Sequence, residues 1–435
     1  IIDFGWMMTV GLLVSLSITF TLLPAVLNIL SRENKNFQDE KKSKITSFLS
    51  KVAQKNTKTI FTSAVIIIIL SILGITKLEV ENSFINYFDK KTEIYKGMKL
   101  IDDKLGGTTP LDVILKFPNQ KEIKTTEDEF DDWDDEDDDD SKYWFTRNKI
   151  DIITKTHDYL DNLDSVGKVI SFASMVRVAE DLNNGKKLQG LEMGVLYTKI
   201  PDSIKREIID PYISIKNNEA RISLRILDSK ENLRRNELIK KINYDLENTI
   251  GLKKEEFKLA GVLILFNNLL QSLFKSQILT LGAVMAGITL MFLILFRNIT
   301  LSLIGVVPNF MAAFLILGII GLLEIPLDMM TITIAAITIG IAVDNSIHYI
   351  YRFKEEFSKN KNYNETLELC HNTVGVAILN TSITIVFGFS ILVLSNFIPT
   401  IYFGIFTGIA MLLAMLSVLT LLPKLILIIK PFGNE

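Results

Sequence analysis

Long apolar stretches constrain the fold of this chain more than any other feature of its sequence. A transmembrane helix needs roughly 20 consecutive and mostly apolar residues. Runs of this kind are predicted at 4–30, 59–75, 278–296, 299–323, 328–350, 374–394 and 400–429. Only Arg297 and Asn298 separate the third run from the fourth. The sequence therefore predicts a polytopic α-helical membrane protein with seven spans.

Between the second and third spans lies a long segment, 78–275, that is too polar for a membrane. Helical patterns occur at 92–104, 147–163 and 230–249, and strand patterns at 111–117, 167–172, 220–227 and 257–262. This alternation predicts an α+β domain with helices on one face of a small sheet.

An acidic run, EDEFDDWDDEDDDD at 127–140, interrupts this predicted domain. It lacks the central glycine and the final glutamate of a calcium-binding loop. The composition predicts a solvated loop, with weak cation binding as the alternative.

Basic residues in the short connections predict how the chain crosses the membrane. If 31–58 is cytoplasmic, every short inner connection holds a Lys or Arg, whereas the outer turns at 324–326 and 396–399 hold none. Cytoplasmic loops carry such an excess, so 78–275 is predicted to be extracytoplasmic. The predicted order is a first span within 1–30, a cytoplasmic linker at 31–58, a second span within 59–77, the extracytoplasmic domain at 78–275, a five-helix bundle at 276–430 and a cytoplasmic tail at 431–435.

The cytoplasmic linker contains an amphipathic pattern. Ile45, Phe48, Leu49 and Val52 follow the i, i+3, i+4, i+7 spacing of one helix face. We expect a helix lying on the membrane surface, with packing against a soluble domain as the alternative.

The first and last spans resemble each other. Phe-Gly opens and Thr-Leu-Leu-Pro closes both 4–24 and 403–423, without a gap between the two alignments. We interpret the first span as the last helix of one repeat, and the next six spans as a second repeat. Transporters are often built from such repeats, with the working site between the halves.

One acid lies inside a membrane span. Ala336, Gly340, Asp344 and His348 recur every four residues and share a helix face, and Asn345 adjoins the acid. Charged groups at membrane depth usually face a bundle interior or a wet cavity and mark an ion path. We therefore predict that Asp344 carries a proton, with His348 and Asn345 as relay candidates and Ala336 and Gly340 as helix-packing residues.

The next span offers a second polar stripe. Asn380, Thr381 and Thr384 are predicted relay partners, and Gly388 is a predicted packing residue. We expect the two stripes to meet across a buried seam. The alternative is that Asp344 is a structural acid bonded to Thr or Asn of this span. Asp328 and Glu324 are expected to be solvated at the outer membrane edge.

Composition narrows the function classes. The net charge is only -3, which argues against a nucleic-acid partner, and the single cysteine, Cys370, allows no intrachain disulfide. The sequence contains no nucleotide-binding glycine loop, no metal-ligand cluster and no nucleophile with a base. We therefore predict neither an enzyme nor a metal site or cofactor.

Several motifs together resemble a known family. They are GIAVDNSIHYIYRF at 340–353, VVPN at 306–309, IPLD at 325–328, VGVAILNTSIT at 374–384 and the two FG…TLLP spans. Their order and spacing are similar to the resistance–nodulation–cell division (RND) superfamily, in particular to MMPL-type predicted exporters related to Patched and sterol-sensing-domain proteins.

The resemblance implies an RND-type helix bundle with an inserted α+β porter-like extracytoplasmic domain. It implies a proton-driven exporter of lipids or other hydrophobic molecules in the bacterial cytoplasmic membrane. The implied partners are protons, membrane lipids, the hydrophobic cargo and the N-terminal half of the same transporter; a homo-oligomer stays open. Asp344 matches the family's membrane acid, but Asn345 replaces the Tyr of mycobacterial members. The alternatives are a protein-translocation component of the superfamily and a lipid- or sterol-sensing protein that does not pump.

Overall fold

The computed structural model describes residues 2–29, 43–81, 83–118, 144–188, 190–230, 233–328 and 330–433. The acidic run at 127–140 and the first part of the polar linker, 31–42, lie outside these ranges. The chain forms two compact units, Ile1–Lys44 and Ile45–Glu435.

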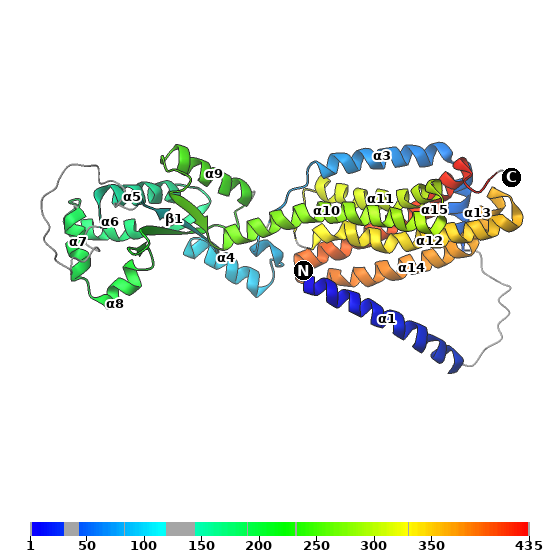
Figure 1. Cartoon of the computed structure of the whole chain (residues 1–435), viewed down its shortest axis with the longest axis horizontal. Helices are drawn as coiled ribbons and strands as arrows, with labels where there is room; N and C mark the ends of the chain where they lie inside the picture. Colours follow the sequence, from blue (N-terminus) through cyan, green and yellow to red (C-terminus); the bar gives the residue numbers. More distant parts are fainter. Residues whose placement is uncertain are drawn as a thin grey trace, which may run out of the picture. The chain divides into compact units, whose positions relative to one another are not determined.

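The first unit contains one long helix, α1 (Ile2–Ile29), with Pro24 inside it (Figure 1). The last helix of the chain, α15 (Ile398–Ile429), likewise has a proline, Pro423, inside it. Pro24 and Pro423 are the residues that close the two aligned TLLP motifs.

The second unit supplies six further membrane helices. With α1 they make seven helices in the described ranges that are long and apolar enough to cross a membrane, which confirms the predicted number. Besides α15 they are α3 (Thr57–Ile75), α10 (Val262–Phe296), α11 (Ile299–Leu322), α12 (Ile334–Asn360) and α14 (Val374–Ser390). A single turn, η4 (Thr331–Thr333), precedes α12, and another, η5 (Ile391–Leu394), follows α14. A short helix, α13 (Tyr363–Asn372), connects α12 to α14.

Helix α11 lies at the centre of the bundle, in contact with α3, α10, α12 and α15. Its closest neighbour is α3, because glycines allow the two backbones to meet. A Cβ atom on Gly74 would lie 1.9 Å from the carbonyl oxygen of Gly318, and one on Gly321 would lie 2.0 Å from that of Gly74. These small residues, rather than Gly340 and Gly388, make the tight helix contact of the described bundle.

The linker helix forms as predicted, but a different face of it is buried. Helix α2 (Lys44–Lys55) buries Thr46, Leu49, Ser50 and Ala53, whereas Ile45 and Phe48 are exposed. Leu49 and Ala53 belong to the core of the membrane bundle. The helix therefore packs on the ends of membrane helices and leaves two large apolar side chains on its other face.

The soluble domain is built on one antiparallel sheet. Its strands are β1 (Thr109–Lys116), β2 (Val166–Ile170), β3 (Ile213–Ser214), β4 (Glu219–Ile226) and β5 (Phe257–Ala260), in the order β2-β4-β1-β5 with β3 paired to β4. The four predicted strands are confirmed, and β3 is an addition. Alternate residues of β1 and β4 point into one core, so one sheet face is covered.

The predicted helices of this domain are also confirmed. They are α4 (Glu93–Leu105), α5 (Arg147–Asp161) and α9 (Arg235–Asn248). Gly106 ends α4 with a φ of 76°, a backbone conformation that favours glycine. The sequence did not predict η1 (Ile85–Tyr87), α6 (Phe172–Leu182), α7 (Gly190–Lys199), α8 (Asp202–Ile204) or the π-helical turn η3 (Lys205–Ile209).

A single helix joins the sheet to the membrane bundle. After β5 the chain turns at Gly261, whose φ of 104° suits glycine, and α10 begins at Val262. The predicted span began only at 278, so the first turns of α10 precede it (Figure 1).

Candidate functional site

Hydrogen bonds to Asp328 stabilise the N-terminal end of the segment that carries the membrane acid. Oδ1 of Asp328 accepts hydrogen bonds from the backbone N–H groups of Met330 and Thr331, both at 2.8 Å, and from the Thr331 hydroxyl. Asp328 is buried, so the expectation that it is solvated is wrong. Glu324 is exposed as expected and lies 3.8 Å from Lys77. Asp328 therefore fixes the chain's entry into α12.

Asp344 and His348 form a pair on the outer surface of the second unit. The distance from His348 Nε2 to Asp344 Oδ1 is 3.3 Å, and the side chains are 64% and 71% exposed, respectively. The expectation of a buried seam is therefore wrong for this unit. The spacing of four residues correctly predicted that these side chains share one face of α12. That face points away from the helices packed against α12.

The buried side of α12 carries different polar residues. Asn345 and Ser346 are both buried. The Asn309 side-chain amide of α11 donates a 3.1 Å hydrogen bond to the Ser346 hydroxyl and a 3.0 Å bond to the Gly305 carbonyl. Because neighbouring residues lie about 100° apart on a helix, Asn345 faces the bundle while Asp344 faces outward. Asn309 was noted from the sequence only as the last residue of the VVPN motif at 306–309, without a role in contacting α12.

The predicted partners on α14 also face outward. Asn380, Thr381 and Thr384 are exposed, and the Thr384 hydroxyl donates to the Asn380 carbonyl of its own helix at 2.9 Å. Among the described residues, no hydrogen bond joins these three to Asp344. Their relay role stays a prediction.

Nothing in the second unit packs against the predicted packing glycines. A Cβ atom on Gly340 or Gly388 would meet no atom within 4 Å, and Ala336 is half-buried. Helices of this unit therefore do not fulfil the packing role predicted for this face. The result is an outer face with small residues, hydroxyls, an amide and an Asp–His pair, which we call the open polar face (Gly340, Asp344, His348, Asn380, Thr381, Thr384 and Gly388).

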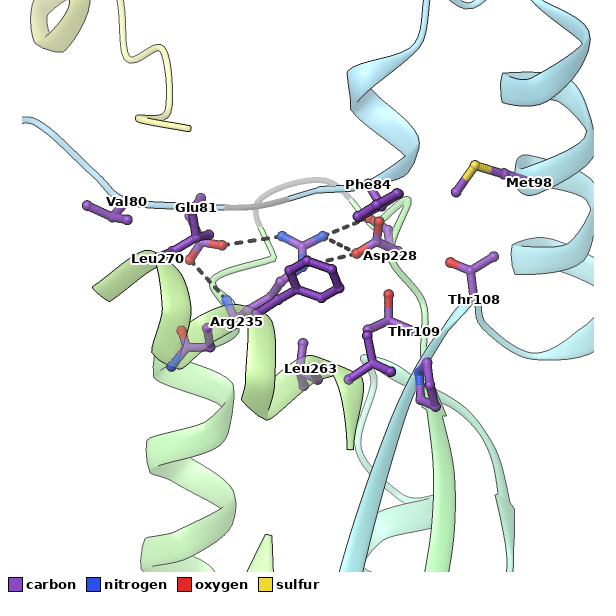
Figure 2. Close-up of a pocket in the computed structure, with 14 residues that line it drawn as sticks. Val80, Glu81, Phe84, Met98, Thr108, Thr109, Asp228, Arg235, Leu263 and Leu270 are labelled. Carbon is purple, nitrogen blue, oxygen red and sulfur yellow. Dashed lines mark hydrogen bonds and ion pairs between the residues drawn. The ribbon is translucent and has the colours of Figure 1, made fainter. Parts of the chain in front are cut away.

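The soluble domain holds a second candidate site where α10 leaves the sheet. A cavity of about 210 Å³ is lined by Phe84, Met98, Leu263, Phe266 and Leu270, together with three charged residues, Glu81, Asp228 and Arg235. In Figure 2 the Arg235 guanidinium lies between the two carboxylates at the wall of this junction cavity.

This ion cluster is shielded from solvent. The Arg235 side chain is 8% exposed and that of Asp228 2%. Arg235 donates through Nε to Asp228 Oδ1 at 3.0 Å, and its Nη1 lies 3.3 Å from Glu81 Oε2. Buried charges are tolerated only when they are paired in this way.

Hydrogen bonds to a neighbouring acid fix the same region. Asp102 accepts from the backbone N–H groups of Thr108, Asp228 and Ser229, at 2.9, 3.0 and 2.9 Å. Burial raises the pKa of Asp102, but the hydrogen bonds from Ser229, Thr108 and Asp228 outweigh it and hold the pKa below its ordinary value.

A third feature is an apolar cavity within the soluble domain. It measures about 220 Å³ and is lined mainly by Phe145, Phe172, Met175, Met193 and Ile209. Large apolar side chains at its edge, among them Val178 and Leu182, are exposed. The short helices α6 to η3 that build it were not predicted, and the cavity was therefore not predicted either.

The described residues bring no three His, Cys, Asp or Glu side chains together as a metal site.

Comparison with known proteins agrees with this architecture. Residues 151–433 match the model of the MMPL family. A Methanocaldococcus jannaschii protein named "Putative membrane protein MJ1562" is 24% identical over 397 residues, which cover 88% of this chain and 94% of that protein. The family match includes the open polar face and most of the sheet, and it confirms the resemblance noted from the motifs. The chain therefore belongs to the MMPL family, whose members are transporter-type, multi-pass membrane proteins.

Proposed function

We propose that this chain forms one half of a proton-driven exporter of lipids or other hydrophobic molecules. Its membrane is the bacterial cytoplasmic membrane, and residues 78–275 lie outside the cell. The chain is a transporter subunit and not an enzyme. The other half is the N-terminal repeat of the same transporter.

The exposed Asp344–His348 pair is the observation that carries this proposal. Asp344 lies about 15 Å along α12 from Ile334, at 1.5 Å per residue, and a bilayer core is about 30 Å thick. The pair therefore belongs near the middle of the membrane, where each charge costs at least about 2.5 kcal/mol if it faces lipid. A second set of helices or a water-filled path must cover the open polar face.

The glycines of this face favour a helical cover. Gly340 and Gly388 have space around them, so the backbone of another helix can approach both. A carboxylate at such an interface needs a cation or a hydrogen-bond donor beside it. His348 lies within reach of Asp344 and can accept or return its proton, which gives two charge states for a switch between two arrangements of the halves.

The soluble domain supplies apolar space for the cargo. The junction cavity and the cavity beside α6 are lined mainly by aliphatic and aromatic side chains, and the junction cavity adds the Arg235 ion cluster. Methionines such as Met175 and Met193 adapt to ligands of different shape. These linings favour a cargo with a long hydrocarbon part.

The test is export of fluorescent phospholipid and fatty-acid analogues by the complete protein. Asp344→Asn should abolish export and its dependence on the proton gradient, whereas Glu324→Gln, which alters an exposed acid outside the bundle, should leave both unchanged. Full export by the Asn variant would refute the proton role. Lipid binding without gradient-dependent movement would instead identify a sensor.

A further inference from the structure

A groove runs along the membrane helices on the side of α3. At its C-terminal end α3 touches α11 through backbone, and a Cβ atom on Gly318 would lie 2.6 Å from Ser71 Cα. Nearer its N-terminus α3 leaves a cavity of about 270 Å³ against α11 and α15. We call this cavity the α3 groove; it is lined by Ile60, Ser63, Ile67, Ala312, Ser417 and Leu421, among others.

Hydrocarbon is the medium next to this groove. Its walls belong to three helices that are each apolar enough to cross a membrane. An unfilled void would forfeit dispersion contacts along all three helices. A lipid chain that enters the groove restores those contacts.

A buried cation lies at the end of the groove that is next to α2. Lys424 follows Leu421 and Ser417 on the same face of α15, and it is 5% exposed. Its ammonium donates to the Gln54 carbonyl in the last turn of α2, at 3.1 Å. Within the described ranges no carboxylate pairs with it, although an ammonium has three donors.

The surroundings add positive charge. Residues 44–58 contain several lysines and no acid, and Lys51, Lys55 and Lys58 are exposed. Basic clusters where membrane helices end attract anionic lipids, and basic pockets between helices bind their headgroups. The apolar groove favours an acyl chain, and the lysines at its end favour an anionic headgroup. Both features together favour an anionic lipid.

We propose that the α3 groove binds an acyl chain of an anionic phospholipid, from the leaflet next to α2, and that Lys424 pairs with its phosphate. The lipid fills the space between α3, α11 and α15 and neutralises the buried ammonium. This site is separate from the open polar face and does not depend on proton coupling.

Photo-crosslinking in nanodiscs tests the site on the full chain. Trace phosphatidylglycerol or phosphatidylcholine with a photoreactive acyl chain is incorporated, and adducts are mapped by peptide mass spectrometry. We expect adducts at 60–67 and 413–421 to exceed those on the exposed stretch 278–280 of α10. A lysine at the membrane surface contributes about 1 kcal/mol to binding an anionic lipid. Adducts with phosphatidylglycerol should therefore exceed those with phosphatidylcholine about fivefold.

Paired variants separate the chain site from the headgroup site. Ser63→Phe should fill the groove and remove its adducts, whereas Thr62→Phe, an exposed neighbour outside the lining, should not. Lys424→Met should abolish the preference for phosphatidylglycerol but keep the adducts, and Lys424→Arg should retain both. Lys354→Met, at an exposed lysine, is the charge control.

Two results would overturn the proposal. One is labelling of the groove no stronger than labelling of the α10 surface, including the case in which another segment, such as α1, occupies the groove. The other is an unchanged lipid preference in Lys424→Met with an intact fold, as judged by its melting temperature.

Discussion

Removing the guanidinium at the junction cavity should loosen the connection between the soluble domain and the membrane helices. Arg235→Met keeps a long apolar stem but leaves Asp228 and Glu81 without their cation. Breaking a buried ion pair on one side costs about 3–5 kcal/mol. The lower figure is appropriate here, because Glu81 is 17% exposed and water can reach part of the cluster.

Hydrogen exchange measures this loss locally. A tenfold change in an equilibrium corresponds to about 1.4 kcal/mol, so 3 kcal/mol predicts exchange about a hundredfold faster in the peptides that contain 79–91 and 228–248. Exposed Arg225 on β4 offers the matched control, since Arg225→Met removes the same charge without opening the cluster.

A triple variant checks the cause. Adding Glu81→Gln and Asp228→Asn to Arg235→Met removes the uncompensated charges and should recover part of the protection. Equal exchange in Arg235→Met and Arg225→Met would show that the cluster does not hold the junction together.

Two further predictions concern packing and pH. Gly318→Ala should lower the melting temperature in detergent, because its Cβ would lie 2.6 Å from the backbone of Ser71, whereas Gly340→Ala should leave it unchanged because nothing is near; equal melting would contradict the close contact. Since the pKa of Asp102 is held below its ordinary value of 3.8, its contribution to stability should be complete above pH 3.8 and fall as the pH drops through the lower folded value. Asp102→Asn should remove this acid-dependent part of the melting curve, and an identical pH profile in wild type and variant would count against it.

The sequence allowed the architecture to be predicted because its signals are long-range and repeated. Each membrane helix needs one long apolar run, so the number of spans followed directly from the sequence. Strand β1 buries Leu111, Val113 and Leu115 at every second position, whereas Asp112 and Ile114 between them are half-buried. Three apolar residues at this spacing identify the buried face of the strand.

The burial of the polar stripes could not be predicted in the same way. Period-four spacing shows that Gly340, Asp344 and His348 share a face, but it does not show which neighbours α12 will have. In the structure the other side of α12, with Asn345 and Ser346, packs on α11. The proposed second half of the transporter would cover this exposed Asp344–His348 pair.

Short elements were missed for a different reason. Helix α8 and the turn η3 are too short to show an apolar period. Helix α6 does show one, with Phe172, Met175, Val176 and Ala179 at the i, i+3, i+4, i+7 spacing, but the predicted strand at 167–172 had taken its first residue. The close contact of α3 and α11 does correspond to a sequence pattern. Each helix carries two small residues three positions apart, Ser71 and Gly74 on α3 and Gly318 and Gly321 on α11.

Proton movement through the complete transporter is the strongest test of whether Asp344 carries the proton. The protein is reconstituted in liposomes that contain a pH-sensitive dye, and proton flux is recorded after a fluorescent phospholipid cargo is added. We expect cargo-dependent flux in the wild type and in Glu324→Gln, and none in Asp344→Asn. Undiminished flux in correctly folded Asp344→Asn would contradict it.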